Sequence, residues 1–322
     1  MAGRRPRERI ALIVTVLDEA STVDALLESV ACQTRPPDQI VIADGGSTDG
    51  TLAKLEGWSK RLPLRVVRAP GTNISRGRNV AIGATDADVI AVTDAGVKLD
   101  ADWLANLQTK LTPLVDVVSG FFRADPRSTF ERALGATTLP NLQDVRPRAF
   151  LPSSRSVLFR RAAWERVGGY PEWLDYCEDV VFDLALRRSG CRFAFASDAI
   201  AWFRPRSSPQ AFFRQYYLYA RGDGKAGLWP RRHAMRYATY LFATYVVVKR
   251  SRLAWLLALG IAAYTRRPFG RLDLSGLSVA ETLRALGLVP VIRLIGDLAK
   301  MLGYPVGVAW RMRAAWTSRS SS

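Results

Sequence analysis

Three acidic side chains stand just after apolar stretches in the first hundred residues. Glu19, Asp44 and Asp94 each follow a run rich in Val, Ile and Ala that has the pattern of a buried strand. Because ligands of α/β sheets bind at the carboxyl ends of the strands, we expect the three carboxylates at one rim. Asp also favours turns, so each of these residues alone could be a turn residue, but three together favour a binding site.

A second acidic pair, Glu178-Asp179, stands before residues 180–188, which have helical spacing. A fixed carboxylate can take the proton of an attacking hydroxyl group, so the pair is a candidate for acid–base chemistry. Negative charge at a helix N-terminus is also stabilised by the helix dipole. From the local sequence alone, a helix cap is the simpler interpretation.

These side chains need a sheet to position them, and the first 95 residues predict one. Apolar, β-branched segments alternate with segments of helical spacing, which indicates a doubly wound α/β sheet. The expected strands are 10–17, 39–43, 64–68 and 89–93, and the expected helices are 18–32, one from 51, and 75–84. An α+β part follows, with strands expected at 117–122, 157–159, 193–196 and 200–203 and helices at 128–138, 161–167 and 180–188.

The composition argues against several kinds of site. The chain has 322 residues, of which 48% are hydrophobic and 23% charged, as in an ordinary folded protein. Its three cysteines lack metal-ligand spacing, and we interpret them as reduced thiols of a cytoplasmic protein. The one histidine, His233, stands in an Arg-rich stretch, which argues against a His-rich metal centre and against a Ser-His-Asp triad.

Five segments, taken in order, resemble glycosyltransferase family 2. They are the strand end 14–19, the loop 40–51 (IVIADGGSTDGT), the Arg-Asn helix start 76–79, Asp94 where an Asp-x-Asp motif belongs, and an acceptor-side run that joins Gly168-Gly169-Tyr170, Glu178-Asp179 and 186–190. Each segment alone is a weak signal, but their order and spacing agree over roughly residues 9 to 225.

The resemblance implies a GT-A fold, a doubly wound mixed sheet with a Rossmann-like nucleotide-binding half. It also implies an inverting hexosyltransferase that takes its sugar from a nucleoside-diphosphate sugar, with the UDP type expected, and uses a divalent cation, Mg²⁺ or Mn²⁺. The acceptor would be a hydroxyl group of a lipid-linked or membrane-proximal saccharide, in the synthesis of cell-envelope polysaccharide or glycolipid.

The resemblance also assigns roles to single residues. The donor-side roles are contact with the nucleoside for Thr15 and Glu19, a hydrogen bond to the base for Asp44, contact with the base or phosphates for Arg78, and contact with ribose, diphosphate and metal for Asp94. On the acceptor side, Asp179 would be the general base. Glu178 would orient the site or raise the pKa of the base through like-charge proximity.

Two positions depart from the family pattern. Gly96 stands where a second metal-binding Asp is usual, and Gly45 stands where a second Asp is frequent. Metal binding would then rest on Asp94 with phosphates and water, or be replaced in part by basic residues. A non-catalytic, nucleotide-sugar-binding membrane scaffold is therefore the alternative function, and Gly96 is its best support.

Residues 214–224 resemble an Arg-Gly element found after the acceptor part of non-processive members. Arg221 in this segment could reach the diphosphate, or the segment could be an amphipathic helix at a membrane interface. Gln215 is not followed by the Arg-Trp pair of processive synthases, which argues against a polymerase of that type.

Residues 230–322 are predicted to be a membrane-association region that follows a catalytic domain over 1–229. This region carries 15 Lys and Arg residues and three acidic residues, a net charge of +12. Such asymmetry suggests a polyanionic partner. No nucleic-acid-binding motif is recognisable, and the aliphatic runs between the basic residues favour an anionic membrane surface.

The apolar runs 238–248 and 253–264 are shorter than the roughly 20 residues that span a bilayer. We therefore expect helices in or on the cytoplasmic leaflet, in a peripheral or monotopic arrangement. The aromatic residues expected at the interface are Trp255, Tyr264, Trp310 and Trp316. A re-entrant hairpin and a buried interface of a homo-oligomer are the alternatives.

Overall fold

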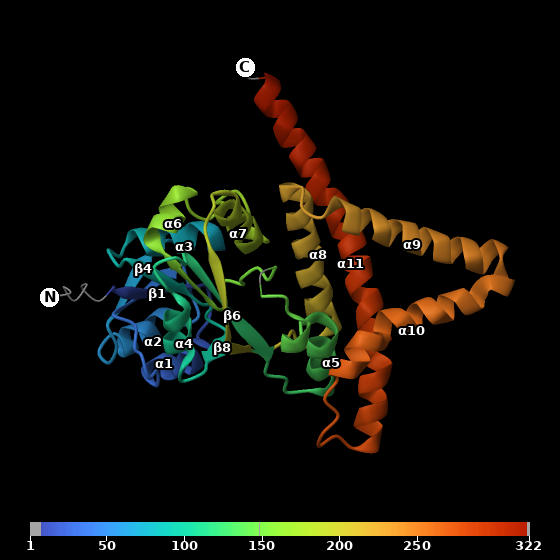
Figure 1. Ribbon diagram of the computed structural model, residues 1–322, viewed down its shortest axis with the longest axis horizontal. Coiled ribbons are helices and arrows are strands. Elements are labelled where there is room, and N and C mark those ends of the chain that lie inside the picture. The colour runs from blue at the N-terminus through green and yellow to red at the C-terminus, as the bar shows by residue number, and fades with distance from the viewer. Residues whose placement is uncertain (1–7, 148, 321–322) are drawn as a thin grey trace. The chain divides into compact units, whose positions relative to one another are not determined.

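The computed structural model describes residues 8–147 and 149–320, and the chain forms two compact units (Figure 1). The first unit comprises residues 1–123 and 142–203, and the second comprises 124–141 and 204–322. These units are defined by packing. The division into a catalytic domain, 1–229, and a membrane-association region, 230–322, concerns activity and stays a prediction.

The first unit is built on a mixed sheet of eight strands, in the order β3-β2-β1-β4-β7-β6-β8-β5. The strands are β1 (Ile10–Val16), β2 (Gln39–Asp44), β3 (Leu64–Arg68), β4 (Val89–Val92), β5 (Val97–Leu99), β6 (Val117–Ala124), β7 (Val157–Arg160) and β8 (Phe193–Phe203). The strands β1 to β4 pair in parallel, whereas β7 pairs antiparallel with β4 and with β6. The parallel half is the doubly wound half that the sequence predicts.

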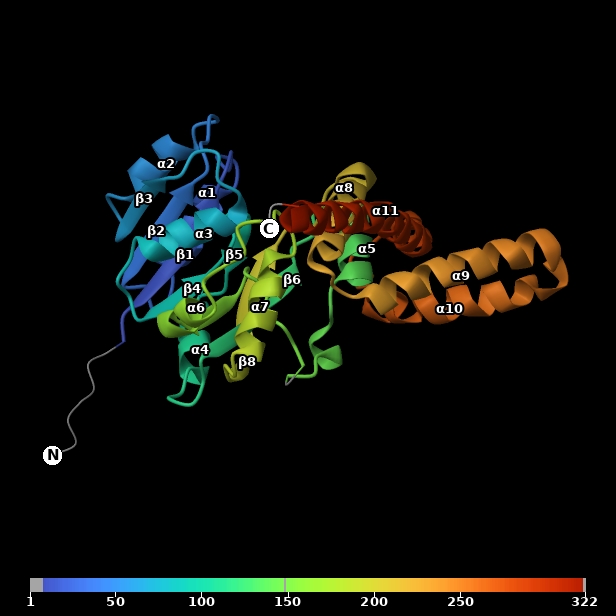
Figure 2. The same cartoon turned by 90° about the horizontal axis from the view of Figure 1, so that it is seen from above.

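Helices cover both faces of this sheet (Figure 2). They are α1 (Val23–Ala31), α2 (Thr51–Trp58), α3 (Ile74–Gly83), α4 (Trp103–Lys110), α6 (Arg161–Arg166) and α7 (Glu178–Arg188), with a short 3₁₀ helix, η1 (Leu142–Asp144). Side chains of β1 alternate between two apolar clusters. Leu12 and Val14 pack with α1, α2 and α4, whereas Ala11 and Ile13 pack with α3, α6 and α7. Burial on both faces explains why β1 is apolar at every position.

The structure contains β5 and α4, which were not among the expected elements, and it differs from the expected elements in two further places. The first helix begins at Val23 rather than at residue 18, because Asp18 has a φ of 54° and starts a loop. The late strands 193–196 and 200–203 are one continuous strand, β8. The polar pair Ser197-Asp198 does not break it, since Asp198 lies on the exposed side of the strand.

The second unit is helical. Its helices are α5 (Thr129–Thr138), α8 (Pro209–Ala226), α9 (Pro230–Lys249), the 3₁₀ helix η2 (Ser251–Leu253), α10 (Ala254–Arg271) and α11 (Val279–Ser320). The helices α8 and α11 pack backbone to backbone. A Cβ atom at Gly307 would lie 2.0 Å from the carbonyl oxygen of Arg221, and one at Gly303 would lie 2.2 Å from that of Tyr217. Glycine at both positions permits this contact.

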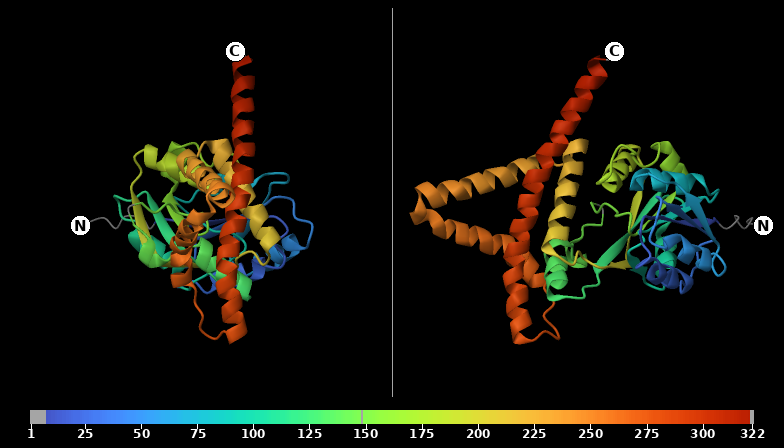
Figure 3. Two further views of the ribbon diagram at one scale, coloured as in Figure 1. Left: turned by 90° about the vertical axis from the view of Figure 1, so that its right-hand side faces the viewer. Right: turned by 180° about the vertical axis from the view of Figure 1, so that it is seen from behind.

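The helices α9 and α10 form a hairpin that extends from α8 and α11 (Figure 3). In the part of the chain that the structure describes, none of the helices combines the length and the apolar character needed to cross a membrane.

Candidate active site

The loops after β1 and β2 are joined by hydrogen bonds at the carboxyl edge of the sheet. The backbone N–H of Asp18 donates to Ser47 Oγ over 3.0 Å, and the N–H of Thr48 donates to Asp18 Oδ1 over 2.8 Å. The N–H of Glu19 donates to Thr51 Oγ1 over 2.8 Å. The two loops therefore form one rigid rim, and its backbone strain lies at Asp18.

Asp44 is the last residue of β2 and is fully buried. Its carboxylate accepts hydrogen bonds from the backbone N–H groups of Ser47, at 3.1 Å, and Gly46, at 3.3 Å. Such contacts are typical of an Asp that shapes its own turn. They also fix the carboxylate, and its predicted contact with a base stays a prediction.

Thr15 and Glu19 lie beside this rim. A Cβ atom at Gly77 would lie 3.0 Å from Thr15 Cγ2, so the start of α3 packs directly on the side chain of Thr15. The Glu19 carboxylate accepts a hydrogen bond from the hydroxyl group of Thr22. The structure therefore places Thr15, Glu19 and Asp44 at the ends of two neighbouring strands, as the sequence predicts.

A buried arginine joins a residue predicted for the donor side to one predicted for the acceptor side. Arg78, on α3, donates to Glu178 Oε1 over 2.6 Å and to Asp94 Oδ1 over 3.0 Å. Its side chain is 3% exposed, and its guanidinium carbon lies 5.2 Å from the centre of the Tyr170 ring. Burial works against the charge of Arg78, but the carboxylates of Glu178 and Asp94 outweigh it and raise the pKa of Arg78. The group is permanently positive.

A second arginine faces Asp94 from the antiparallel half of the sheet. Nε of Arg155 lies 3.5 Å from Asp94 Oδ2, and the Arg155 guanidinium stacks over the Phe203 ring at 4.5 Å. The carbonyl oxygen of Arg155 accepts a hydrogen bond from Thr93 Oγ1 at 2.8 Å, which ties its backbone to the end of β4. Asp94 thus lies between two guanidinium groups.

Glu178 and Asp179 begin α7, directly after Cys177, whose φ is 64°. Asp179 Oδ1 accepts a hydrogen bond from the N–H of Val180 over 2.8 Å, so the pair does occupy the helix N-terminus. Glu178 is buried and bound to Arg78, whereas Asp179 is half-buried. Both interpretations of the pair, helix cap and acid–base pair, are compatible with this geometry.

Two buried acidic residues of α7 have raised pKa values. Burial and the charge of Asp179 raise the pKa of Glu178 to about 7, against the opposing effect of Arg78. Burial, with the charge of Asp179, also holds the pKa of Asp183 well above its usual range. Among the described residues, Asp183 Oδ2 has no hydrogen-bond partner. Burial therefore favours the protonated form of Asp183.

Three residues of this region were not predicted as site residues. Asp183 stands four residues after Asp179, a spacing that places both on one helix face and was readable from the sequence. Asp18 stands beside Glu19 in the same strand end. The contact of Arg155 with Asp94 had no signal in the sequence, because it depends on how β7 pairs with β4.

Arg221 belongs to α8 in the second unit, and its predicted contact with a diphosphate stays a prediction.

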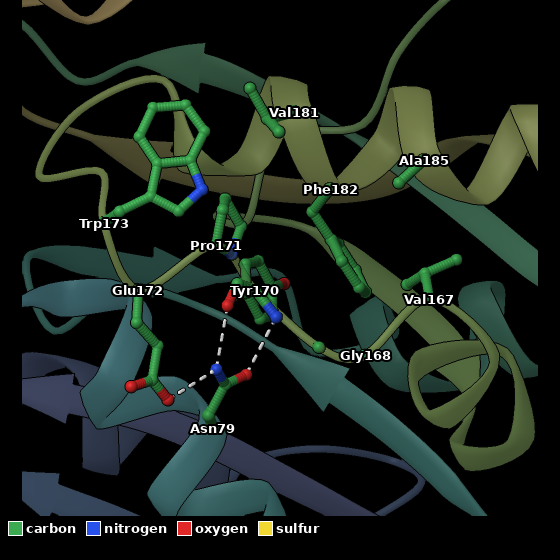
Figure 4. A pocket seen from close by; sticks show the side chains of 11 residues that line it. Asn79, Val167, Gly168, Tyr170, Pro171, Glu172, Trp173, Val181, Phe182 and Ala185 are labelled. Atoms are coloured by element: carbon green, nitrogen blue, oxygen red, sulfur yellow. Dashed lines mark hydrogen bonds between the residues drawn. The ribbon is translucent and has the colours of Figure 1, made fainter. Parts of the chain in front are cut away.

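A pocket of about 360 Å³ lies between α7 and the loop 167–173 (Figure 4). Asn79 holds this loop: its Nδ2 donates to the carbonyl oxygen of Tyr170 over 2.9 Å, and its Oδ1 accepts from the N–H of Tyr170 at 2.9 Å and from Trp164 Nε1 at 3.1 Å. None of the predicted site residues lines the pocket. Asn79 therefore supports the loop that leads to Asp179.

A divalent cation at Asp94 would need free oxygen ligands. Oδ1 of Asp94 accepts from Arg78, and Oδ2 faces Arg155. Within residues 8–147 and 149–320, no three His, Cys, Asp or Glu side chains gather in a way that could hold a metal ion. The residues present do not fit a metal ion held by the protein alone, and we derive no step from one.

The chain is similar to a glycosyltransferase family and to two relatives named for polysaccharide synthesis. Residues 11–167 match the family model described as "Glycosyl transferase family 2". The O-antigen chain rhamnosyltransferase RfbN of Salmonella typhimurium is 24% identical over 222 residues, which cover 65% of this chain and 70% of that protein. The succinoglycan biosynthesis protein ExoA of Rhizobium meliloti is 28% identical over 229 residues, which cover 66% of this chain and 68% of that protein.

Two solved structures share the fold. The mannosyltransferase PcManGT from Pyrobaculum calidifontis, in complex with GDP-Man and Mn²⁺, has a TM-score of 0.57 at 21% identity, over 95% of this chain and 87% of that chain. Residues 1–349 of TarS from S. aureus, in complex with UDP-GlcNAc, have a TM-score of 0.53 at 16% identity, over 95% of this chain and 92% of that chain. These likenesses show the fold alone.

Proposed function

This chain belongs to glycosyltransferase family 2 and has the predicted GT-A fold, and from that premise we propose that it moves a sugar from a nucleoside-diphosphate sugar to an acceptor hydroxyl group with inversion. The observation that carries the proposal is Arg78. Its guanidinium group links Asp94, on the predicted donor side, to Glu178, which stands beside the predicted base Asp179.

The donor's nucleoside would bind at the joined loops after β1 and β2. Thr15, Glu19 and Asp44 lie there, and Asp44 has a carboxylate that its own loop holds in place. A pyrimidine edge presents an N–H donor, for which a fixed carboxylate is a suitable acceptor. This favours a UDP-type donor.

Cations near Asp94 would stabilise the leaving nucleoside diphosphate. Negative charge develops on the diphosphate as its bond to the sugar breaks, and preorganised positive groups lower the barrier most. Arg78 is buried and fixed by two carboxylates, whereas Arg155 has a side chain that is 23% exposed and a longer contact to Asp94. Arg155 is thus the more exposed of the two groups and the candidate for contact with a phosphate, while Arg78 holds Asp94.

Asp179 would take the proton. The acceptor oxygen forms a bond to the anomeric carbon as the carbon–oxygen bond to the diphosphate breaks, its electron pair leaves with the diphosphate, and the acceptor proton goes to Asp179. Attack from the side opposite the leaving group inverts the configuration. Glu178 positions Arg78 and lies next to Asp179, so we assign it a positioning role.

The acceptor is proposed from the relatives. RfbN is named as an O-antigen chain rhamnosyltransferase and ExoA as a succinoglycan biosynthesis protein. A lipid-linked or saccharide acceptor in such a process, met at the cytoplasmic face of the membrane, is the corresponding proposal for this chain.

A thermal-shift screen tests the donor site. Donors of the UDP, GDP and TDP classes should be compared, each with Mg²⁺, with Mn²⁺ and with EDTA. We expect one class to raise the melting temperature of the wild type and to lose this effect in Asp44→Ala. If Asp44→Ala keeps the shift, the nucleoside site is assigned wrongly.

The alternative, a nucleotide-sugar-binding scaffold without catalysis, is favoured by one observation: both oxygens of Asp94 face arginines, and Gly96 supplies no second carboxylate. Turnover of the donor that the screen identifies separates the two functions, because a scaffold would bind the donor and leave its sugar–phosphate bond intact.

A further inference from the structure

The α9–α10 hairpin has an unusual charge. From Pro230 to Leu272 the chain carries nine Lys and Arg residues and no Asp or Glu. The three acidic residues of the C-terminal part all lie outside it, and each has a partner of its own. Asp297 binds Arg236, and Asp273 lies 3.9 Å from Arg132. The Glu281 carboxylate accepts a hydrogen bond from the hydroxyl group of Ser278.

The base of the hairpin is fixed. Asp297, on α11, accepts hydrogen bonds from Arg236 at 2.8 Å and from Tyr240 at 3.2 Å, both on α9, and from Tyr264, on α10, at 2.9 Å. Its side chain is 6% exposed. One buried carboxylate therefore joins both arms of the hairpin to α11.

A second polar contact fixes the start of α9. The ring of His233 stacks on Tyr304 of α11 at 3.8 Å, and its Nε2 lies 3.1 Å from Asp223 Oδ2. Because buried polar contacts of this kind are costly to break, the hairpin projects in a defined direction.

Beyond its base, the hairpin is almost uncovered. From 241 to 264, Val246 is the only fully buried side chain. The large apolar side chains exposed in this stretch are Leu241, Phe242, Tyr245, Val247, Val248, Leu253, Trp255, Leu259, Ile261 and Tyr264. Exposed apolar surface is unfavourable in water, and this concentration of exposed apolar side chains in one segment marks a candidate interaction site.

The charge of the hairpin decides what covers it. A second copy of the chain would bring nine more cations and no anion to the same contact, so the copies would repel each other. An anionic lipid surface supplies both complements, phosphates for the cations and acyl chains for the apolar side chains. Each Lys or Arg near such a surface adds to the attraction.

We propose that the α9–α10 hairpin binds along the surface of an anionic lipid leaflet, with its apolar side chains at the boundary between head groups and acyl chains. The hairpin lies along the leaflet and does not enter tip first, because its turn carries Lys249, Arg250 and Arg252. None of these three has an ion-pair partner among the described residues. Tip-first insertion would place them in hydrocarbon, which is expensive.

Vesicle flotation tests the proposal without any donor or acceptor, so its outcome is independent of the proposed enzymatic function. The full chain is mixed with vesicles of phosphatidylcholine alone, or with 30% phosphatidylglycerol, at about 50 mM and about 500 mM salt. We expect flotation with the anionic vesicles, weakened at least tenfold by the higher salt.

Two triple variants make the test specific. Lys249→Glu, Arg250→Glu and Arg252→Glu change the turn of the hairpin, and we expect vesicle binding to fall more than tenfold. Lys60→Glu, Lys98→Glu and Lys110→Glu change exposed lysines of the first unit by the same charge. We expect this control to bind within about threefold of the wild type. Equal losses in both triples would mean binding by net charge alone and would overturn the proposal.

A neutral variant tests the apolar side of the contact. Phe242→Ser with Trp255→Ser leaves the charge unchanged, and we expect at least a fivefold loss of vesicle binding. In the wild type, lipids brominated near the head group should quench Trp255 fluorescence, taken as the difference from Trp255→Phe, more than lipids brominated near the chain ends. Stronger quenching by the deep label, no binding to anionic vesicles, or a lipid-free dimer that the hairpin variants dissociate would each contradict the proposal.

Discussion

The site around Arg78 and the α9–α10 hairpin use the same side chain in opposite ways. Arg78 is 3% exposed and bound to two carboxylates within its own unit. Arg250 and Arg252 are exposed, and no acidic residue lies in the 43 residues around them. In the first arrangement, the buried cation has its counter-charges inside its own unit. The second is complete only when something outside the chain supplies the negative charge and covers the apolar surface.

Removal of Arg78 should produce the largest effect. Arg78→Ala leaves Glu178 buried without its cation, and we expect a loss of about 3–5 kcal/mol in the free energy of unfolding, measured by urea denaturation. Arg76→Ala is the matched control, since the Arg76 side chain is 64% exposed and lies 4.0 Å from Glu172. We expect that variant within about 0.5 kcal/mol of the wild type. Equal stability of the two variants would refute the buried ion-pair account.

The pH dependence of stability should show the next largest effect. Glu178 has a pKa raised from 4.5 to about 7, so the folded state binds its proton more tightly than the unfolded state does. Its contribution is therefore fully present below pH 4.5 and is lost as the pH rises through 7. Glutamine does not titrate, so Glu178→Gln cannot lose this contribution. Between pH 4.5 and 8 we expect the free energy of unfolding of Glu178→Gln to fall about 2 kcal/mol less than that of the wild type.

Melting curves of both proteins across this range check the prediction. Asp183 has a pKa shifted in the same direction, and Asp179 acts on both, so the wild-type curve includes their contributions. Burial and Asp179 are larger causes of the Asp183 shift than Glu178 is, so the difference between the wild-type and Glu178→Gln curves reports mainly Glu178. Parallel curves would show that Glu178 titrates normally.

Gly96 offers a gain-of-function test of the site. A Cβ atom there meets nothing within 4 Å, and Gly96 is not among the glycines with positive φ, so an aspartate fits without strain. A second carboxylate would give a metal ion a ligand that does not face an arginine. We expect Gly96→Asp to increase the enhancement of UDP or GDP binding by Mn²⁺ about tenfold over the wild type, which is about 1.4 kcal/mol. Calorimetric titration with and without EDTA measures it, and an unchanged Mn²⁺ effect would contradict the fit argument.

The smallest effect on stability should come from removing charges of the hairpin in lipid-free buffer. Arg250→Ala with Arg252→Ala removes two charges that have no ion-pair partner among the described residues. In lipid-free buffer we expect the free energy of unfolding to stay within about 0.5 kcal/mol of the wild type, by urea denaturation. A larger loss would mean that these arginines stabilise the fold itself, and the contrast with Arg78 would fail.

Much of the parallel half could be predicted from the sequence. The strands β1, β2 and β4 contain continuous apolar runs, because burial on both faces leaves little room for polar residues. Acidic residues that follow such runs could be placed at one rim, because the carboxyl ends of parallel strands lie at the same edge of the sheet. The helix of Glu178 and Asp179 was predictable from periodicity, but its contact with Arg78 spans 100 residues and depends on tertiary packing.

Less of the antiparallel half could be predicted from the sequence. Arg155 meets Asp94 because β7 pairs with β4, and nothing in the sequence near residue 155 encodes that pairing. Two strands were expected at 193–196 and 200–203, but they are one strand, β8, because a strand tolerates a polar residue such as Asp198 on its exposed side. The charge asymmetry of the C-terminal part was visible in the sequence, but the hairpin that gathers it was not.

The central claim is that Asp179 is the general base. The most direct test compares Asp179→Asn with Asp175→Asn, and it measures the rate of sugar transfer to a competent acceptor together with donor binding. The second variant makes the same chemical change at an exposed neighbour. We predict that Asp179→Asn lowers the transfer rate by about 10²–10⁴-fold while donor affinity stays within about twofold of the wild type, and that Asp175→Asn changes neither. Unchanged transfer in Asp179→Asn would contradict the assignment of Asp179 as the general base.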